Sequence, residues 1–303
     1  MPILYWLEKI RVPGLNEFML AITTLGEETA FLVIAMIFFW CVDKKKGYYI
    51  MAVGFAGTML NQFLKLFFRI PRPWVLDENF TILEQAREAA GGYSFPSGHT
   101  QIAVGTFGSI AVFAEKKWQR WVCIILAVLV GFSRMYVGVH TPVDVLVGAA
   151  CAVVLIWAFK KPVLNGEVKH MKLTIAAVMV LAVAFLLYVE LYPFPQNMDV
   201  HNLTSGYKNA YTMMGCLVGV AIVYVADLKW LNFSTEAKWW IQILKVVVGL
   251  GLVLAVKEGL RAPLEMVLPV YPARAVRYFL IVLTAGVIWP LSFQYLSKIG
   301  VKK

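Results

Sequence analysis

Long apolar stretches, separated by short polar turns, run along most of the chain. Each stretch approaches the roughly 20 residues that a helix needs to cross a hydrocarbon layer about 30 Å thick. The stretches lack the alternation of apolar and polar residues that is typical of membrane-spanning strands. We therefore predict about nine membrane-spanning helices, over residues 26–42, 47–67, 98–114, 118–137, 141–159, 171–192, 210–226, 239–256 and 276–297.

The composition also indicates a membrane setting. Apolar residues make up 60% of the 303 residues and charged residues only 15%, and the mean hydropathy is +0.71. A soluble domain of this length carries considerably more charge. We therefore predict an all-α fold, a polytopic bundle of transmembrane helices.

Lysine and arginine are distributed unevenly between the two ends of these helices. Clusters at residues 44–46, 116–120 and 160–172 fall on one side, together with Lys298 and the terminal Lys302 and Lys303. Because basic residues concentrate on cytoplasmic loops, we expect the N-terminus outside and the C-terminus inside. The formal net charge of +10 then reflects this asymmetry and contact with anionic lipid head groups, and not nucleic-acid binding.

Polar residues with catalytic potential lie at the opposite, outer helix ends. They form three groups: Lys65 with Arg72-Pro73, then Pro96-Ser97-Gly98-His99, and then Ser133-Arg134 with His140 and Asp144. A phosphate there would meet three cations, because Arg72 and Arg134 can bind oxygens bidentately and Lys65 adds a point charge. Phosphoryl transfer depends on such fixed positive charge and on a nucleophile placed in line.

The residues around the two histidines suggest the rest of the chemistry. Ser97 and Gly98 open a helix, so unpaired backbone N–H groups would face the anion. His140 and Asp144 are four apart, so we expect them on one helical face, where the carboxylate would orient the imidazole for attack on phosphorus. The residues alone leave the roles of His99 and His140 interchangeable. This set requires neither a metal nor a cofactor, and we expect none.

In order and spacing, the three groups resemble the signature of the type 2 phosphatidic acid phosphatase (PAP2) superfamily, which reads K-x6-RP, PSGH and SR-x5-H-x3-D. The resemblance covers roughly residues 20–160. It implies that His140 is the nucleophile that becomes phosphorylated. It also implies that His99 protonates the leaving group and later activates water.

The resemblance further implies metal-independent hydrolysis of a lipid phosphate or diphosphate, such as phosphatidate, phosphatidylglycerol phosphate or undecaprenyl diphosphate. We expect a bacterial plasma membrane, a site facing the periplasm or cell exterior, and membrane lipids as partners. Three alternatives stay open: transfer to an acceptor other than water, a sugar-phosphate phosphatase of the glucose-6-phosphatase type, and a non-catalytic lipid-binding protein. The nine-span topology is also similar to the glucose-6-phosphatase and sphingosine-phosphate phosphatase branches. Neither the lipid nor the oligomeric state follows from the sequence.

Three parts of the chain are expected. Residues 1–25 mix apolar and charged side chains, which is typical of a short helix in the membrane interface. Residues 26–160 form the catalytic helix core, and residues 161–303 form transmembrane helices in which no motif is found.

Two further features lie outside the signature. Residues 74–93 are polar with a partial apolar stripe, so we expect an outer-surface helix that acts as a lid. Lys245 interrupts an apolar helix, where a charge costs about 2.5 to 3.5 kcal/mol. We therefore expect Lys245 to have a carboxylate partner, or a stem that carries the charge to the surface, with binding of a lipid head group as the less favoured role.

Overall fold

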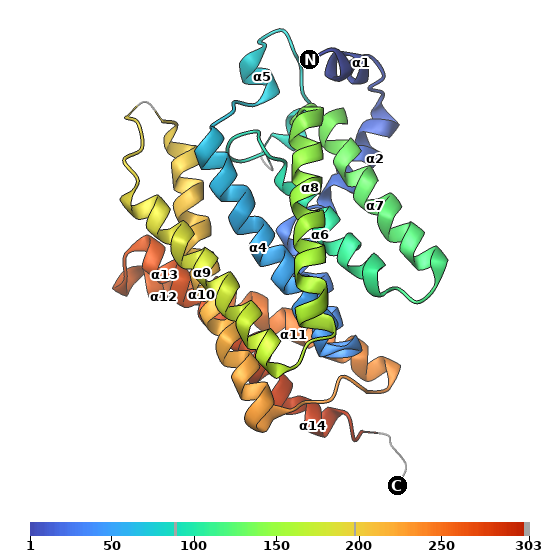
Figure 1. Cartoon of the computed structure of the whole chain (residues 1–303), viewed down its shortest axis with the longest axis vertical. Helices are drawn as coiled ribbons and strands as arrows, with labels where there is room; N and C mark the ends of the chain where they lie inside the picture. Colours follow the sequence, from blue (N-terminus) through green and yellow to red (C-terminus); the bar gives the residue numbers. More distant parts are fainter. Residues whose placement is uncertain (88–89, 197, 300–303) are drawn as a thin grey trace. The chain divides into compact units, whose positions relative to one another are not determined.

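The computed structural model of the protein describes residues 1–87, 90–196 and 198–299. Within these residues every regular element is a helix (Figure 1), as the all-α prediction required. The helices form two compact units. Unit 1 consists of the described residues of Met1–Leu32, Val53–Lys161 and Pro193–Gly206, and unit 2 of those of Val33–Ala52, Pro162–Tyr192 and Tyr207–Lys303. The three expected parts of the chain stay a prediction.

The number of membrane-spanning helices differs from the expected nine. In the described residues, seven helices are long and apolar enough to cross a membrane, and a bent pair, Pro13–Thr24 with Glu28–Val42, brings the number to eight. Helix α6, Gly98–Phe113, has only 16 residues. At 1.5 Å per residue it is about 24 Å long, shorter than a hydrocarbon layer of about 30 Å. The nine-span count is therefore not confirmed, although the chain is an integral membrane protein.

Unit 1 carries the signature residues. Its helices are α1 (Pro2–Lys9), α2 (Pro13–Thr24), the start of α3 (Glu28–Ile37), most of α4 (Lys44–Phe68), α5 (Pro73–Leu76), α6, α7 (Lys117–Tyr136) and α8 (Pro142–Phe159). Helix α6 packs against both α7 and α8, and α2 packs against α7 (Figure 1).

Proline sets several helix starts in unit 1. Pro13, Pro73 and Pro142 each occupy the first helical position, where the missing N–H group has no partner to lose. The N-terminal segment, expected to form one short helix, forms two. Helix α1 ends at Lys9, and Pro13 begins α2.

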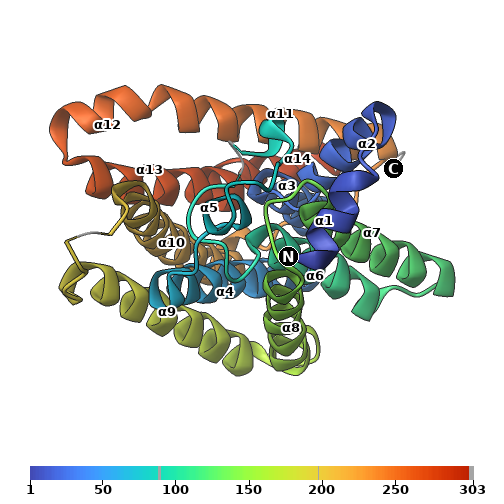
Figure 2. The same ribbon diagram turned by 90° about the horizontal axis from the view of Figure 1, so that it is seen from above.

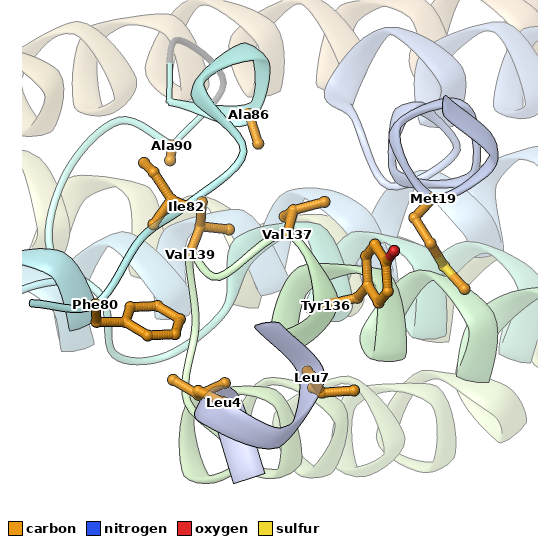
Figure 3. Close-up of a cluster of buried hydrophobic side chains, with 10 residues drawn as sticks. All are labelled: Leu4, Leu7, Met19, Phe80, Ile82, Ala86, Ala90, Tyr136, Val137 and Val139. Atoms are coloured by element: carbon orange, nitrogen blue, oxygen red, sulfur yellow. The ribbon is translucent and has the colours of Figure 1, made fainter. Parts of the chain in front are cut away.

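Residues 74–93 do not form the expected surface helix. In their described part, with residues 88–89 left aside, the helical turns are the end of α5 and a single 3₁₀ turn at Glu84–Ala86. Their apolar residues Phe80, Ile82, Ala86 and Ala90 are buried. Figure 3 shows the cluster that these four form with Leu4, Leu7, Met19, Tyr136, Val137 and Val139. The apolar stripe that suggested a helix therefore anchors an irregular segment to α1 and to the end of α7.

Unit 2 contains helices from the second half of the chain. They are α9 (Val168–Leu191), most of α10 (Val200–Ala226), α11 (Trp239–Gly259), α12 (Arg261–Val267), α13 (Val270–Leu283) and α14 (Phe293–Leu296). Helices α11 and α13 run side by side (Figure 2).

Lys245 of α11 is completely buried within unit 2. Its Nζ donates hydrogen bonds to the carbonyls of Ser234 at 3.2 Å and Thr235 at 3.3 Å. It also lies 4.5 Å from the centroid of the Phe293 ring. Among the described residues, carbonyl dipoles and an aromatic face surround this ammonium group, in place of the expected carboxylate partner or a stem that reaches the surface.

Candidate active site

Lys65 lies in the last turn of α4, and its side chain is buried. Its Nζ donates a hydrogen bond to the carbonyl of Tyr93. A lysine in this position brings a positive charge to the end of α4, next to the segment that leads into α6. The signature places Lys65 among the phosphate-binding residues, and its carbonyl partner is a group that a phosphate oxygen can replace.

Arg72 is the N-cap residue of α5 and is also buried. Its Nε and Nη2 donate to the carbonyls of Gly92 at 3.0 Å and Gly91 at 2.8 Å. Its Nη1 donates to the carbonyl of Val139 at 2.9 Å. The guanidinium therefore joins the segment before α6 to the loop after α7, and its donors face carbonyl oxygens where a phosphate was expected.

The start of α6 is arranged by Ser97. Its hydroxyl accepts from the backbone N–H of Thr100 at 3.4 Å and from the Thr100 hydroxyl at 2.9 Å, as an N-cap side chain does. Its own backbone N–H donates to the carbonyl of Asp144 at 2.9 Å. The first N–H groups of α6, at Gly98 and His99, precede the first intrahelical hydrogen bond and are therefore the ones suited to an anion.

A close approach between α8 and the start of α6 supports this arrangement. A Cβ atom added at Gly148 would lie 2.6 Å from the carbonyl oxygen of Ser97. Only glycine allows that approach, since real Cβ contacts are longer. The hydrogen bond from the Ser97 N–H to the Asp144 carbonyl depends on the same approach. Because Gly148 lacks a side chain, these two signature residues can come together.

Two signature residues have buried side-chain nitrogens without a partner among the described residues. In the described part of the chain, no hydrogen-bond partner is found for His99 Nε2, Arg134 Nε or Arg134 Nη2, although each of these atoms is buried. The remaining Arg134 nitrogen, Nη1, donates to the hydroxyl of Thr23. Leaving a buried donor unpaired costs about 1 to 3 kcal/mol, so such groups need an explanation. An anion bound between them would supply it.

His140 is buried in the loop between α7 and α8. The loop turns at Gly138, whose φ of +91° is a conformation that favours glycine. A hydrogen bond of 3.2 Å from the Val139 N–H to the Arg134 carbonyl closes it. This turn holds His140 close to Arg134, which lies in the last turn of α7.

The expected placement of His140 and Asp144 on one helical face is only partly correct. Thr141 is the N-cap residue of α8, so His140 lies just before the helix and Asp144 is its third residue. Asp144 Oδ2 and the Thr141 hydroxyl form a reciprocal capping box. His140 Nδ1 lies 3.5 Å from the same Asp144 Oδ2. The capping box, and not helical periodicity alone, therefore brings the carboxylate to the imidazole.

The surroundings of His140 favour its neutral form. Burial is the largest cause that lowers the pKa of His140, and the positive charges of Arg72, Lys65 and Arg134 lower it further. Nε2 of His140 lies 2.8 Å from Arg72 Nη1, which can only donate. Nε2 therefore carries the lone pair, and the proton sits on Nδ1, on the side of Asp144. A neutral imidazole with an unprotonated Nε2 is the form that acts as a nucleophile.

All eight predicted site residues lie in unit 1, at the end of α4, before α5, at the start of α6, at the end of α7 and around the start of α8. Contacts join Arg72, His140, Asp144 and Ser97. The charges of Lys65, Arg134 and His99 act on His140. Among the described residues, no group of three His, Cys, Asp or Glu side chains could hold a metal ion. The sequence analysis did not single out Thr23, Ser94 or Gly148, because their signal is a contact with a distant part of the chain.

Comparison with known proteins places this site in a family. Residues 45–165 match the PAP2 superfamily, and residues 211–300 match the transmembrane extension of PAP2 superfamily phosphatases. The chain belongs to the PAP2 superfamily. The resemblance was expected to begin near residue 20, but the family match begins at residue 45. The second match falls in the C-terminal helices, where the sequence analysis found no motif.

Several curated relatives share this region. The chain is 35% identical over 117 residues to undecaprenyl-diphosphatase BcrC of Bacillus subtilis, covering 39% of this chain and 58% of that protein. It is 34% identical over 164 residues to phosphatidylglycerophosphatase B of Bacillus subtilis, covering 50% and 76%. A probable sphingosine-1-phosphate phosphatase of Dictyostelium discoideum is 29% identical over 170 residues, covering 52% and 41%. No solved structure matches the chain.

Proposed function

We propose that this chain is a membrane phosphatase that removes phosphate from a lipid phosphate or diphosphate through a phosphohistidine. The observation that carries the proposal is the set of buried nitrogens on Arg134 and His99 that lack partners among the described residues. They lie in the same cluster as a neutral histidine, His140, and two further buried cations. Fixed donors of this kind stabilise the charge that develops on a transferring phosphoryl group.

The proposed first step is an in-line displacement. The Nε2 lone pair of His140 attacks phosphorus, so an N–P bond forms while the bond from phosphorus to the leaving oxygen breaks. A protonated His99, whose charge the bound phosphate anion stabilises, gives its proton to that oxygen. Arg72 exchanges its carbonyl partners for phosphate oxygens, and Lys65 and Arg134 bind the others. The positive charge on the phosphorylated ring is balanced by Asp144.

The second step regenerates the enzyme. Water attacks phosphorus, the now neutral His99 takes a proton from that water, and the N–P bond breaks. Inorganic phosphate leaves, His140 is neutral again, and His99 is protonated again. The net reaction consumes one water and yields phosphate together with an alcohol or a lipid monophosphate. None of these steps uses a metal ion.

A lipid substrate is supported by the position of the site and by the relatives. The signature residues lie at the ends of apolar helices, so a head group tethered to a membrane chain would arrive with part of its translational freedom already lost. The first two relatives are named for undecaprenyl diphosphate and phosphatidylglycerophosphate. Because the lysine-rich loops lie at the opposite helix ends, we also propose that the site faces the cell exterior or periplasm of a bacterial plasma membrane.

The test is phosphate release by the purified protein in detergent. Substrates are undecaprenyl diphosphate, phosphatidylglycerol phosphate, phosphatidate, a short-chain soluble analogue and glucose 6-phosphate. We expect a long-chain lipid to exceed the short-chain analogue and glucose 6-phosphate in kcat/KM by at least about tenfold, or 1.4 kcal/mol. His140→Ala should lose at least about 10³-fold in kcat, whereas the matched control His170→Ala, in unit 2, should not.

Each alternative function gives a different result in this test. A preference for glucose 6-phosphate would indicate a sugar phosphatase, and product that depends on an added alcohol would indicate a phosphotransferase. Lipid binding without phosphate release would indicate a binding protein. An acid-labile phosphoenzyme that still forms in His140→Ala would show that another residue is the nucleophile.

A further inference from the structure

Ser94 is a completely buried serine three residues before Ser97, outside the PAP2 signature. Its hydroxyl donates to Asp144 Oδ2 at 2.6 Å, across 50 positions of sequence. Its backbone N–H donates to the carbonyl of Ile70 at 2.8 Å. The backbone of Ser94 is therefore bound to the segment before α5, and its side chain to the carboxylate at the start of α8.

The oxygen that Ser94 contacts is the one that faces the proposed nucleophile. Asp144 Oδ2 also accepts from the Thr141 backbone N–H at 2.7 Å. His140 Nδ1 lies 3.5 Å from it, which is longer than an ordinary N–H···O hydrogen bond. Two short donors thus fix the carboxylate, and the imidazole is its third and most distant neighbour.

We propose that Ser94 is a positioning residue for phosphoryl transfer, which fixes Asp144 and shares its charge so that His140 stays a neutral nucleophile until the N–P bond forms. The inference rests on the proposed function. As the N–P bond forms, the ring becomes positive and its attraction to Asp144 increases. An interaction that is stronger in the transition state than in the ground state raises kcat, and Ser94 maintains the geometry that allows it.

The charges around His140 determine how loss of the Ser94 hydroxyl would change the pKa of His140. Arg72, Lys65, Arg134 and His99 all oppose a positive charge on His140, and Asp144 is the carboxylate that favours it. Without the Ser94 hydrogen bond, more of the Asp144 charge acts on His140 and raises its pKa. Activity requires the neutral imidazole and is lost as the pH falls through that pKa. The acidic limb of the kcat/KM profile should therefore move to higher pH.

Three substitutions at Ser94 separate the hydrogen bond from the space that it fills. Ser94→Ala removes the hydroxyl, Ser94→Cys keeps a side chain of similar size with only a weak donor, and Ser94→Thr keeps the hydroxyl. The matched control is Ser109→Ala, because Ser109 of α6 is equally buried but its hydroxyl has no hydrogen-bond partner among the described residues. The readouts are kcat, KM, the pH profile and the thermal unfolding temperature of the full-length protein in detergent.

We expect Ser94→Ala and Ser94→Cys to lower kcat about tenfold, in the range of a general acid–base contribution, with KM changed less than about twofold. Both should move the acidic limb of kcat/KM upward, whereas Ser94→Thr and Ser109→Ala should resemble the unmodified protein. A normal kcat and an unmoved limb in a folded Ser94→Ala or Ser94→Cys would overturn the proposal. So would equal unfolding of all three Ser94 variants, since Ser94 would then serve only the fold.

The same experiment distinguishes this failure from failure of the proposed function. His140→Ala is measured in parallel. If it remains active, the phosphohistidine mechanism is wrong and the role of Ser94 falls with it. If it is inactive while Ser94→Ala matches the unmodified protein, the proposed function stands and only the role of Ser94 is wrong.

Discussion

Nη1 of Arg72 lies 2.8 Å from Nε2 of His140. The arginine that we expect to bind the phosphate therefore faces the nitrogen that we expect to attack it. A phosphate oxygen that replaces this contact would be delivered beside the lone pair of the nucleophile. Phosphate binding and nucleophilic attack thus depend on the same pair of side chains, one just before α5 and one in the loop before α8.

The first prediction concerns the charge of Arg72. Arg72→Gln removes a cation that lowers the pKa of His140. Because activity needs neutral His140 and is lost below its pKa, the acidic limb of kcat/KM should move to higher pH. The loss of a donor should also lower kcat by about 10²-fold or more. Arg72→Lys keeps the charge, so its limb should stay in place while its KM rises; an unmoved limb in Arg72→Gln would contradict this account.

The second prediction concerns Thr23, which lies outside the family match that begins at residue 45. Its hydroxyl accepts from Arg134, which presents two other buried nitrogens to the site. Thr23→Val should let Arg134 move and lower kcat/KM roughly tenfold, the effect of about 1.4 kcal/mol from one hydrogen bond to a charged group. The control is Thr24→Val, because Thr24 is exposed and its hydroxyl donates to the Ala21 carbonyl of its own helix. Equal activity of the two variants would show that the N-terminal helices do not contribute to the site.

The third prediction concerns metal ions. Lys65, Arg72 and Arg134 supply the positive charge that a metal supplies in many phosphatases. Activity should persist after extensive treatment with a chelator. Orthovanadate, which mimics five-coordinate phosphorus, should inhibit. Complete loss in chelator that magnesium restores would contradict the proposed mechanism.

The fourth prediction concerns the side of the membrane. Glu78 precedes the site end of α6, and Glu115 follows its other end; both are exposed. In a background without the four native cysteines, Glu78→Cys should react with an impermeant thiol reagent in intact cells, whereas Glu115→Cys should react only after lysis. The opposite pattern would reverse the proposed orientation. Ser94 is unsuitable for such labelling because it is completely buried.

The sequence predicted the positions of the helices better than it predicted which of them span the membrane. Hydrophobic length identified α7 and α8 closely, because residues that face lipid must be apolar along the whole helix. It also identified α6 closely, but the 16 residues of Gly98–Phe113 are not among the helices long enough to cross a membrane. The sequence also suggested a helix in residues 74–93. Phe80 and Ile82 are apolar there because they pack against α1, and the spacing of apolar residues does not show which element they contact.

The candidate site shows the same difference between local and distant information. The signature connects Lys65, His99 and His140 through spacing, which is readable in one dimension. It does not reveal that the Arg72 donors meet backbone carbonyls, nor that a capping box brings Asp144 to His140. Those contacts depend on where α5 and α8 begin in space.

The sequence by itself determined that this protein is a helical membrane protein and which polar residues are candidates for catalysis. Both follow from the length of the apolar stretches and the spacing of the motif residues, which can be read from the sequence without knowing the fold. Only the tertiary structure decided that Ser94 holds Asp144 and that Thr23, 111 positions away, holds Arg134. The reason is physical: a hydrogen bond forms only within about 3 Å, and helix packing alone brings such distant residues within that distance.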